Sequence, residues 1–222
     1  MSSGSNKPLL LLFDMDGTLT PPRQPMSEDM KAIVCASSGK NCVGIVTGSD
    51  FVKIMEQLNS DIDFFKKIDY IFPENGVLGF KKGVQFTSRS ISEELGEELL
   101  KNVINYCLRY IADLDLPVKR GTFIEFRKSM INVCPIGRNC SKGERELFMQ
   151  LDLSNGIRQK LVECLEREFG TEQLKFSIGG QISVDIFPIG WDKSYCLNHI
   201  DRNMYEAIHF FGDKTLPVNY VQ

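Results

Sequence analysis

The stretch Leu9-Leu10-Leu11-Leu12-Phe13-Asp14-Met15-Asp16-Gly17-Thr18 decides the fold. Its five apolar residues, bounded by polar ones, predict a short buried strand, which is typical of a parallel sheet. Asp14 and Asp16 are two residues apart, so an extended chain points both carboxylates to the same side. Gly17 then allows a tight turn. Since open α/β sheets bind ligands beyond the carboxyl ends of their strands, this pair is expected at a ligand site.

Two neighbouring carboxylates repel each other, so a divalent cation is expected between them. An oxygen-rich site with few protein ligands suits Mg²⁺ that is bound together with a phosphate group. For Asp-x-Asp-Gly alone, a solvated turn is the better interpretation. The full pattern after an apolar run is much more specific, and it favours a phosphate-handling site.

Strands and helices alternate along the first third of the chain, which favours a parallel α/β sheet. Strands are predicted at Leu9–Phe13, Asn41–Val46 and Tyr70–Phe72. One helix is expected after Ser27, with Met30, Ile33 and Val34 on one side, and a second after Ser49 or Asp50. A later strand, Ala207–Phe211, ends in Gly212-Asp213 and is expected to rejoin the same sheet.

The middle of the chain predicts an inserted α+β module. A hairpin is expected at Val77–Phe86, a long helix after Ser90, another helix capped by Ser154, and a strand over Phe176–Phe187. In that last strand apolar and polar residues alternate, which indicates one face on a core and one on solvent. The expected organisation is an α/β core domain at 1–85 and 188–222, with an α+β cap domain at 86–187 between the two core segments.

Composition limits the possible functions. The 222 residues carry a formal net charge of −3, with 42% hydrophobic and 25% charged residues, as in an ordinary soluble domain. No overall basic field would attract nucleic acid or anionic lipid. Leu9–Phe13 is too short to span a membrane. The seven cysteines form no CxxC pair and the chain has two histidines, so we expect reduced thiols in a cytoplasmic protein rather than a zinc site.

The Asp14–Thr18 pattern resembles the signature of the haloacid dehalogenase superfamily of phosphoryl-transfer enzymes. That resemblance implies that Asp14 is the nucleophile, that Asp16 is the general acid/base, and that Mg²⁺ is required. Three further residues lie where that superfamily needs them. Thr47, with Ser49 as the alternative, would donate a hydroxyl to the phosphoryl group, Lys193 would supply a fixed positive charge, and Asp213 would join Asp14 and Asp16 as a metal ligand.

The insert carries arginines that could hold a second phosphate. Arg127, Arg138 and Arg145 follow or flank predicted strands, and arginine grips phosphate with paired hydrogen bonds. Ser183 and Asp185 share one strand face and could bond to sugar hydroxyls or to the phosphate. From periodicity alone, an ordinary charged sheet face explains these residues equally well.

A further resemblance rests on six longer segments, which are Phe72–Gly76, Arg120–Arg127, Pro135–Arg138, Ser177–Ser183, Gly190–Lys193 and Phe210–Thr215. These segments are similar to those of eukaryotic phosphomannomutases. The resemblance implies interconversion of mannose 6-phosphate and mannose 1-phosphate for GDP-mannose synthesis. It further implies a hexose 1,6-bisphosphate activator, a homodimer formed through the cap, and substrate contacts from Arg23, Arg127, Arg138, Arg145, Ser183 and Asp185.

The resemblance ends near Pro217, where that family continues with Gly-Gly-Asn-Asp and this chain has Val218–Gln222. We expect this truncated second core segment to destabilise the fold, to weaken Mg²⁺ binding and to lower activity. Two alternatives stay open at this point. One is a sugar-phosphate phosphatase on the same fold, and the other is a low-activity chain that acts only as a dimer partner.

Overall fold

A computed structural model describes residues 7–22 and 24–213. The chain divides into two compact units, a core at 1–88 with 191–222 and a cap at 89–190. The predicted boundaries lie three residues earlier at both junctions. They differ because the hairpin strand β5 (Val84–Ser88) and the cap strand β9 (Ser183–Pro188) each run further than the apolar pattern suggests.

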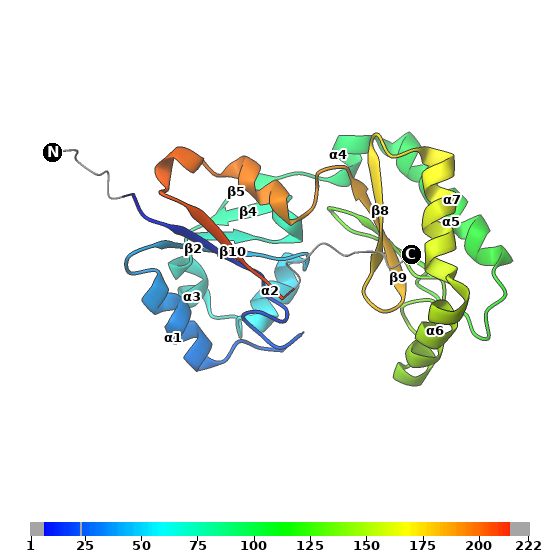
Figure 1. Cartoon of the computed structure of the whole chain (residues 1–222), viewed down its shortest axis with the longest axis horizontal. Coiled ribbons are helices and arrows are strands. Elements are labelled where there is room, and N and C mark those ends of the chain that lie inside the picture. The colour runs from blue at the N-terminus through cyan, green and yellow to red at the C-terminus, as the bar shows by residue number, and fades with distance from the viewer. Residues whose placement is uncertain (1–6, 23, 214–222) are drawn as a thin grey trace. The chain divides into compact units, whose positions relative to one another are not determined.

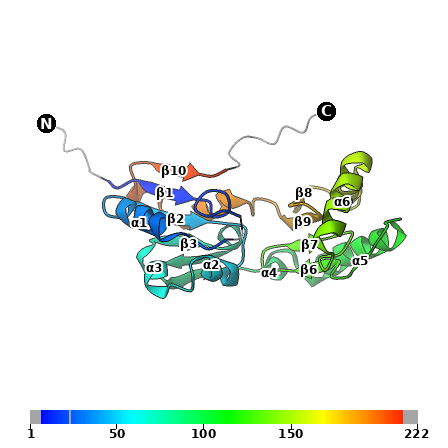
Figure 2. The same cartoon turned by 90° about the horizontal axis from the view of Figure 1, so that it is seen from below.

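The core contains a six-stranded sheet in the order β10-β1-β2-β3-β4-β5. The first four strands in this order are parallel to one another, whereas β4 pairs antiparallel with β3 and forms an antiparallel hairpin with β5 at one edge. Figure 2 shows β10, β1, β2 and β3 side by side. This confirms the predicted α/β fold with a parallel-sheet core. The remaining strand bounds are β1 (Leu10–Phe13), β2 (Cys42–Val46), β3 (Tyr70–Phe72), β4 (Leu78–Lys81) and β10 (Ile208–Phe211).

Both faces of the core sheet are covered, which explains why its central strands are apolar throughout. Helices α1 (Glu28–Ser37), α2 (Phe51–Gln57) and α3 (Ile62–Lys67) cover one face. The other face packs against the short 3₁₀ turn η2 (Lys193–His199) and against Ile200 and Tyr205, which flank a second turn, η3 (Arg202–Met204) (Figure 1). Val43 and Ile45 of β2 point to the helices, and Val46 points to the 3₁₀ turns. A further 3₁₀ turn, η1 (Glu74–Gly76), follows β3.

Side-chain caps set where the core helices begin. Ser27 and Asp50 accept hydrogen bonds from the backbone N–H groups of Met30 and Lys53, as predicted for Ser27 and for the second of the two candidate caps. The predicted inward position of Ile33 is wrong, because 59% of this residue is exposed. Helix α1 presents only a narrow apolar stripe to the sheet, and Ile33 lies outside that stripe.

The cap contains a four-stranded antiparallel sheet in the order β6-β7-β9-β8. Its strands are β6 (Ile124–Phe126), β7 (Ile131–Val133), β8 (Leu174–Gly179) and β9. Helices α5 (Glu97–Asp113), α6 (Lys142–Asn155) and α7 (Ile157–Phe169) lie on one side of this sheet (Figure 1). The short helix α4 (Ile91–Leu95) precedes them.

Glycines divide three cap elements that the sequence pattern had joined or misplaced. The predicted long helix is interrupted at Gly96, whose φ of 76° lies outside helical values, so α4 and α5 are separate. The predicted single strand is the hairpin of β8 and β9, which turns at Gly180. Ser154 is not a helix cap, because it lies in the last turn of α6, and α7 begins only after Gly156 in a left-handed conformation.

Helix α6 was not predicted, although its N-terminus carries a complete capping box. The Ser141 hydroxyl accepts from the backbone of Glu144, and the Glu144 carboxylate accepts from the backbone of Ser141.

No helix within residues 7–22 and 24–213 is both long enough and apolar enough to cross a membrane.

Replacing Phe148 with Ala is expected to lower the free energy of unfolding of the cap by about 3–5 kcal/mol. Phe148 is 1% exposed and packs against Cys134, Ile136 and Ile182, so its removal leaves a cavity. Urea denaturation would measure the change. Leu153→Ala on the same helix is the control, since Leu153 is 83% exposed and should change stability by less than about 0.5 kcal/mol. Equal effects of the two substitutions would contradict this account of the cap core.

Candidate active site

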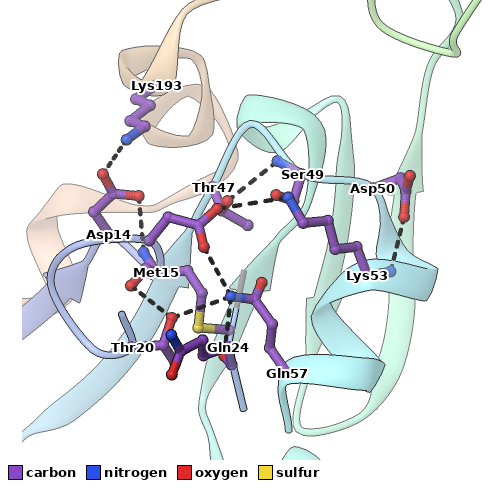
Figure 3. A network of polar contacts seen from close by, with 11 residues as sticks. Asp14, Met15, Thr20, Gln24, Thr47, Ser49, Asp50, Lys53, Gln57 and Lys193 are labelled. Atoms are coloured by element: carbon purple, nitrogen blue, oxygen red, sulfur yellow. Dashed lines mark hydrogen bonds and ion pairs between the residues drawn. The ribbon is translucent and has the colours of Figure 1, made fainter. Parts of the chain in front are cut away.

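Asp14 lies at the carboxyl end of β1, between the ends of β2 and β10. Its backbone N–H continues the pairing with β10 by donating to the Phe211 carbonyl at 2.8 Å. This hydrogen bond fixes Asp14 at the carboxyl end of the parallel strands. Only 5% of Asp14 is exposed. One carboxylate oxygen accepts from the backbone N–H of Met15 at 2.7 Å, and the other pairs with the ammonium of Lys193 (Figure 3). Asp14 Oδ2 is therefore held toward the ammonium group of Lys193, which lies 179 positions further along the chain.

Lys193 reaches Asp14 from a loop that two side chains hold in place. The Asp192 carboxylate caps η2 by accepting from the Ser194 backbone at 2.9 Å. The side-chain amide of Asn75 donates to the Trp191 carbonyl at 3.2 Å, while the backbone N–H of Asn75 donates to the Thr47 carbonyl at 2.8 Å. Asn75 thus ties the end of β2 to the loop that carries Lys193. It was not predicted as a site residue, although the segment Phe72–Gly76 that contains it had been noted.

Thr47 follows β2 directly and is 2% exposed. Its hydroxyl oxygen accepts from the backbone N–H of Ser49 at 3.1 Å, which leaves the hydroxyl proton able to donate. Between the two candidates for phosphoryl contact, Thr47 therefore carries a positioned hydroxyl at the strand end. Asp50, one residue beyond Ser49, caps α2.

The Asp16 carboxylate is held by two residues that were not predicted as site residues. The side-chain amide of Gln57 donates to Asp16 Oδ1 at 2.8 Å, and Lys53 Nζ lies 3.7 Å from Asp16 Oδ2. Both come from α2, which brings residues 51–57 beside the Asp14–Thr20 loop (Figure 3). A helical spacing of four residues between Lys53 and Gln57 was the signal that could have placed them on one face.

Asp213 lies two residues beyond β10, next to the turn after Asp16. A Cβ atom at Gly17 would lie 2.7 Å from Asp213 Oδ2, so only glycine leaves room for this carboxylate. Gly17 also has a φ of 84°, which other residues adopt only with strain. Glycine is therefore required at position 17 for two reasons, the positive φ of the turn and the close approach of Asp213.

The three carboxylates predicted as metal ligands do not form one group in the structure. Across residues 7–22 and 24–213, no three or more histidine, cysteine, aspartate or glutamate side chains gather where they could hold a metal ion. Instead, Asp14 is paired with Lys193, and Asp16 with Gln57 and Lys53. The donors are oxygens, which suit a hard cation, but their placement does not fit a formed site.

A second polar cluster lies on the cap sheet. Glu125, Asn132 and Asp185 occupy one row across β6, β7 and β9, because Glu125 is paired in register with Asn132, and Asn132 with Asp185. Since neighbours in a row share a face, their side chains lie on the side opposite to Ile131 and Val184. The two apolar residues are fully buried, so the polar row occupies the other face of the sheet.

Arg127 and Arg138 join this row. Arg127 donates from Nε and Nη2 to the two oxygens of Glu125, both at 3.1 Å, and Arg138 Nε lies 2.5 Å from Glu125 Oε2. Arg138 also donates to Asn132 Oδ1 at 2.5 Å, and Asn132 donates to Asp185 Oδ1 at 2.5 Å. The structure therefore brings together Arg127, Arg138 and Asp185 of the predicted set, and adds Glu125 and Asn132.

Burial and the neighbouring arginines shift the pKa of the two carboxyl groups in opposite directions. Burial raises the pKa of Asp185, and the hydrogen bond from Asn132 with the nearby Arg127 and Arg138 offsets only part of this effect. Burial would also raise the pKa of Glu125, but Arg127 and Arg138 outweigh it and hold that pKa below its usual value. Glu125 therefore carries a full negative charge at neutral pH.

The other predicted contacts differ in position. The Ser183 hydroxyl is buried and donates to the Gly179 carbonyl at 2.9 Å, so it braces the hairpin. Arg145 lies in the first turn of α6 and is half-buried. Arg23 lies outside the described residues, as do Lys214–Gln222, which include the predicted divergent end.

Comparison with known proteins identifies the family. The model of the family described as "Eukaryotic phosphomannomutase" matches residues 30–220. A phosphomannomutase 2 of Dictyostelium discoideum is 49% identical over 210 residues, which cover 95% of this chain and 84% of the relative. Phosphomannomutase 1 of Homo sapiens is 49% identical over 209 residues, with 94% and 80% covered.

The chain belongs to the eukaryotic phosphomannomutases.

Solved structures support the fold of this phosphomannomutase family member. A crystal structure from Thermotoga maritima aligns with a TM-score of 0.60 at 18% identity, covering 93% of this chain and 80% of that one. A haloacid dehalogenase-like hydrolase from Bacteroides thetaiotaomicron aligns with a TM-score of 0.52 at 13% identity, covering 87% and 76%. At these identities the likeness concerns the fold alone.

Gln57→Leu is expected to lower kcat by about 100-fold, since Asp16 would lose the amide that orients it. The free energy of unfolding should fall by about 1–3 kcal/mol, because Gln57 Nε2 also donates to the Thr20 hydroxyl at 3.1 Å and to the Gln24 carbonyl at 3.4 Å, and leucine leaves these acceptors without that donor. Turnover assays and thermal unfolding would measure both. Gln159→Leu is the control, because Gln159 is half-buried on α7 and its side-chain amide donates to Glu163 on the same helix. A loss of turnover matched by a large loss of stability would assign Gln57 a structural role only.

Proposed function

We propose that this chain is a phosphomannomutase that interconverts mannose 6-phosphate and mannose 1-phosphate through a phosphoryl group carried on Asp14, and so supplies GDP-mannose synthesis. Family membership supports the reaction. The observation that carries the assignment of Asp14 is its carboxylate at the end of β1, 5% exposed and paired with Lys193. A carboxylate can attack phosphorus at neutral pH without first losing a proton.

In the proposed first step, an Asp14 oxygen forms a bond to the phosphorus of a hexose 1,6-bisphosphate, and the bond from phosphorus to the sugar oxygen breaks. Asp16 gives a proton to that leaving oxygen. In the reverse direction, Asp16 takes the proton from a hydroxyl of the bound monophosphate as that oxygen attacks the phosphoryl group on Asp14. Lys193 and the Thr47 hydroxyl would stabilise charge on the transferring group.

Isomerisation requires the sugar bisphosphate to turn around between the two steps. The distal phosphate needs a site away from Asp14, and we assign this to the cap arginines Arg127 and Arg138, with Arg145, Ser183, Asp185 and Arg23 as further contacts. Paired guanidinium groups suit a phosphate at either end of the sugar, because they recognise the anion and not the ring.

We also propose that turnover requires Mg²⁺ and a hexose 1,6-bisphosphate activator. The fold and the family favour a divalent metal, and the oxygen donors Asp14, Asp16 and Asp213 suit its chemistry. Their carboxylates would have to turn away from Lys193, Gln57 and Lys53 to ligate one ion. From the same family resemblance we expect a cytoplasmic protein that forms a homodimer through the cap. Sedimentation of the purified protein and of cap variants would test the dimer.

A coupled assay on the purified chain tests the function. Mannose 1-phosphate conversion should depend on Mg²⁺ and rise with catalytic amounts of hexose 1,6-bisphosphate. The bisphosphate should persist during turnover. Its net consumption without isomerisation would instead show a phosphatase, and the absence of both reactions from well-folded protein would refute the proposal.

A further inference from the structure

Glu125 occupies the hydrogen-bonding positions that a phosphate would need. Arg127 presents two parallel N–H donors to its two carboxylate oxygens, and Arg138 presents a third donor at 2.5 Å. The same forked geometry is how arginine binds phosphate. Any phosphate that reaches these two arginines must therefore displace the Glu125 carboxylate or leave their strongest donors unused.

The position of Glu125 is fixed by the sheet and not by a flexible loop. It lies on β6 with Asn132 opposite, and Arg127 follows two residues later on the same face. The side chains of Glu125, Arg127 and Arg138 are 36%, 27% and 30% exposed, so an incoming anion can reach all three. Glu125 is therefore an accessible but pre-positioned anion within the arginine pair.

We propose that Glu125 competes with the distal phosphate for Arg127 and Arg138. By displacing the phosphate from the two arginines, the Glu125 carboxylate would release the bound sugar bisphosphate quickly enough for it to turn around. The inference rests on the proposed function, because only a mutase must free the same phosphate within each cycle. A site of two arginines without the carboxylate would hold the distal phosphate longer, and a held bisphosphate cannot present its other end to Asp14.

The charge balance agrees with this role. Arg127 and Arg138 carry two positive charges, and the ionised Glu125 offsets one of them at the site seen by an incoming anion. Asp185, held beside the pair by Asn132, lowers the positive charge further when it is ionised. Asn132 bridges Arg138 to Asp185, so Arg138 is oriented from its other side when Glu125 leaves it. Arg138 thus keeps one partner during the exchange, while the two Arg127 donors pass from Glu125 to the phosphate.

Glu125→Gln in the full chain tests the proposal. Titration calorimetry with inorganic phosphate should show binding about 10-fold tighter than in the wild type, since a charged competitor is replaced by a neutral one. Mutase assays should show a lower KM for the sugar monophosphate together with a lower kcat. A purely structural role for Glu125 would instead raise KM or leave it unchanged.

The matched control is Glu94→Gln. Glu94 also lies in the cap and pairs with an arginine, Arg89, at 2.6 Å, and its side chain is likewise 36% exposed. It removes the same charge from the same unit and should change neither phosphate affinity nor KM. In a background with Arg127→Ala and Arg138→Ala, Glu125→Gln should give no gain, which assigns the gain to the cap and not to the Asp14 site.

Phosphate affinity that is unchanged or weaker in Glu125→Gln overturns the proposal, whether or not the wild type binds phosphate measurably. If that variant fails to fold by circular dichroism, Glu125→Asp takes its place, since the shorter side chain cannot reach both arginines and should give a smaller gain of about 3-fold. Failure of the proposed function has a different signature, because phosphate would still bind more tightly while neither variant nor wild type isomerises the sugar.

Discussion

Asp14→Asn is expected to lower kcat for mannose phosphate interconversion by at least about 10,000-fold, because the amide cannot attack phosphorus. The substitution keeps the size of the side chain and its place at the end of β1, so the fold should persist. The amide would lose the charge pair with Lys193, and no phosphoryl group should become attached to the chain.

Two measurements check this expectation. The coupled mutase assay gives kcat, and acid quenching after incubation with a labelled hexose bisphosphate gives the phosphoryl group bound per chain. Asp63→Asn is the control, since Asp63 is an exposed residue in the first turn of α3 and should leave both values unchanged. Turnover of Asp14→Asn within about 10-fold of the wild type would remove the nucleophile from the mechanism.

Arg138→Ala is expected to separate mutase from hydrolase activity. Loss of a charge-assisted pair of hydrogen bonds to the distal phosphate should lower mutase turnover by about 100-fold or more. Hydrolysis of a hexose bisphosphate should fall by less than about 10-fold, since phosphoryl transfer to Asp14 uses the core residues. The difference arises because only isomerisation requires the cap to hold each orientation of the same intermediate.

Parallel assays of isomerisation and of phosphate release from bisphosphate would measure the two rates. Arg120→Ala is the matched control, because Arg120 pairs with Glu144 elsewhere on the cap and its side chain is 45% exposed. Equal loss of both activities in Arg138→Ala would contradict the role assigned to the cap arginines.

Sequence reasoning recovered those parts of the fold whose signals are local. The run before Asp14 predicted β1, and Ser27 predicted the start of α1, because a buried strand and an N-cap are both encoded within a few residues. It missed α3 and α6 and misplaced the start of α7. There the deciding feature was a single glycine or a cap whose helix shows only a weak apolar stripe.

The same division holds for the candidate site. Asp14 and Lys193 could be proposed from motifs, since each follows a recognisable segment. Gln57, Asn75 and Glu125 were not predicted, because their importance comes from contacts made after folding, and helical spacing alone would have placed Gln57 beside Lys53 but not beside Asp16. Gln57 meets Asp16 across the helix–loop boundary, and Glu125 meets Arg138 only when β6 and β7 pair.

The placement of β1 between β2 and β10 has a consequence for synthesis of the protein on the ribosome. About 120 residues separate β5 from β10, and at the usual rates of translation they take roughly 6–24 s to emerge. During that interval β1 has an open edge where β10 will later pair. Every nascent chain therefore carries Asp14 before it carries Lys193, and the proposed site at the end of β1 stays incomplete until β10 has been made and has paired with β1.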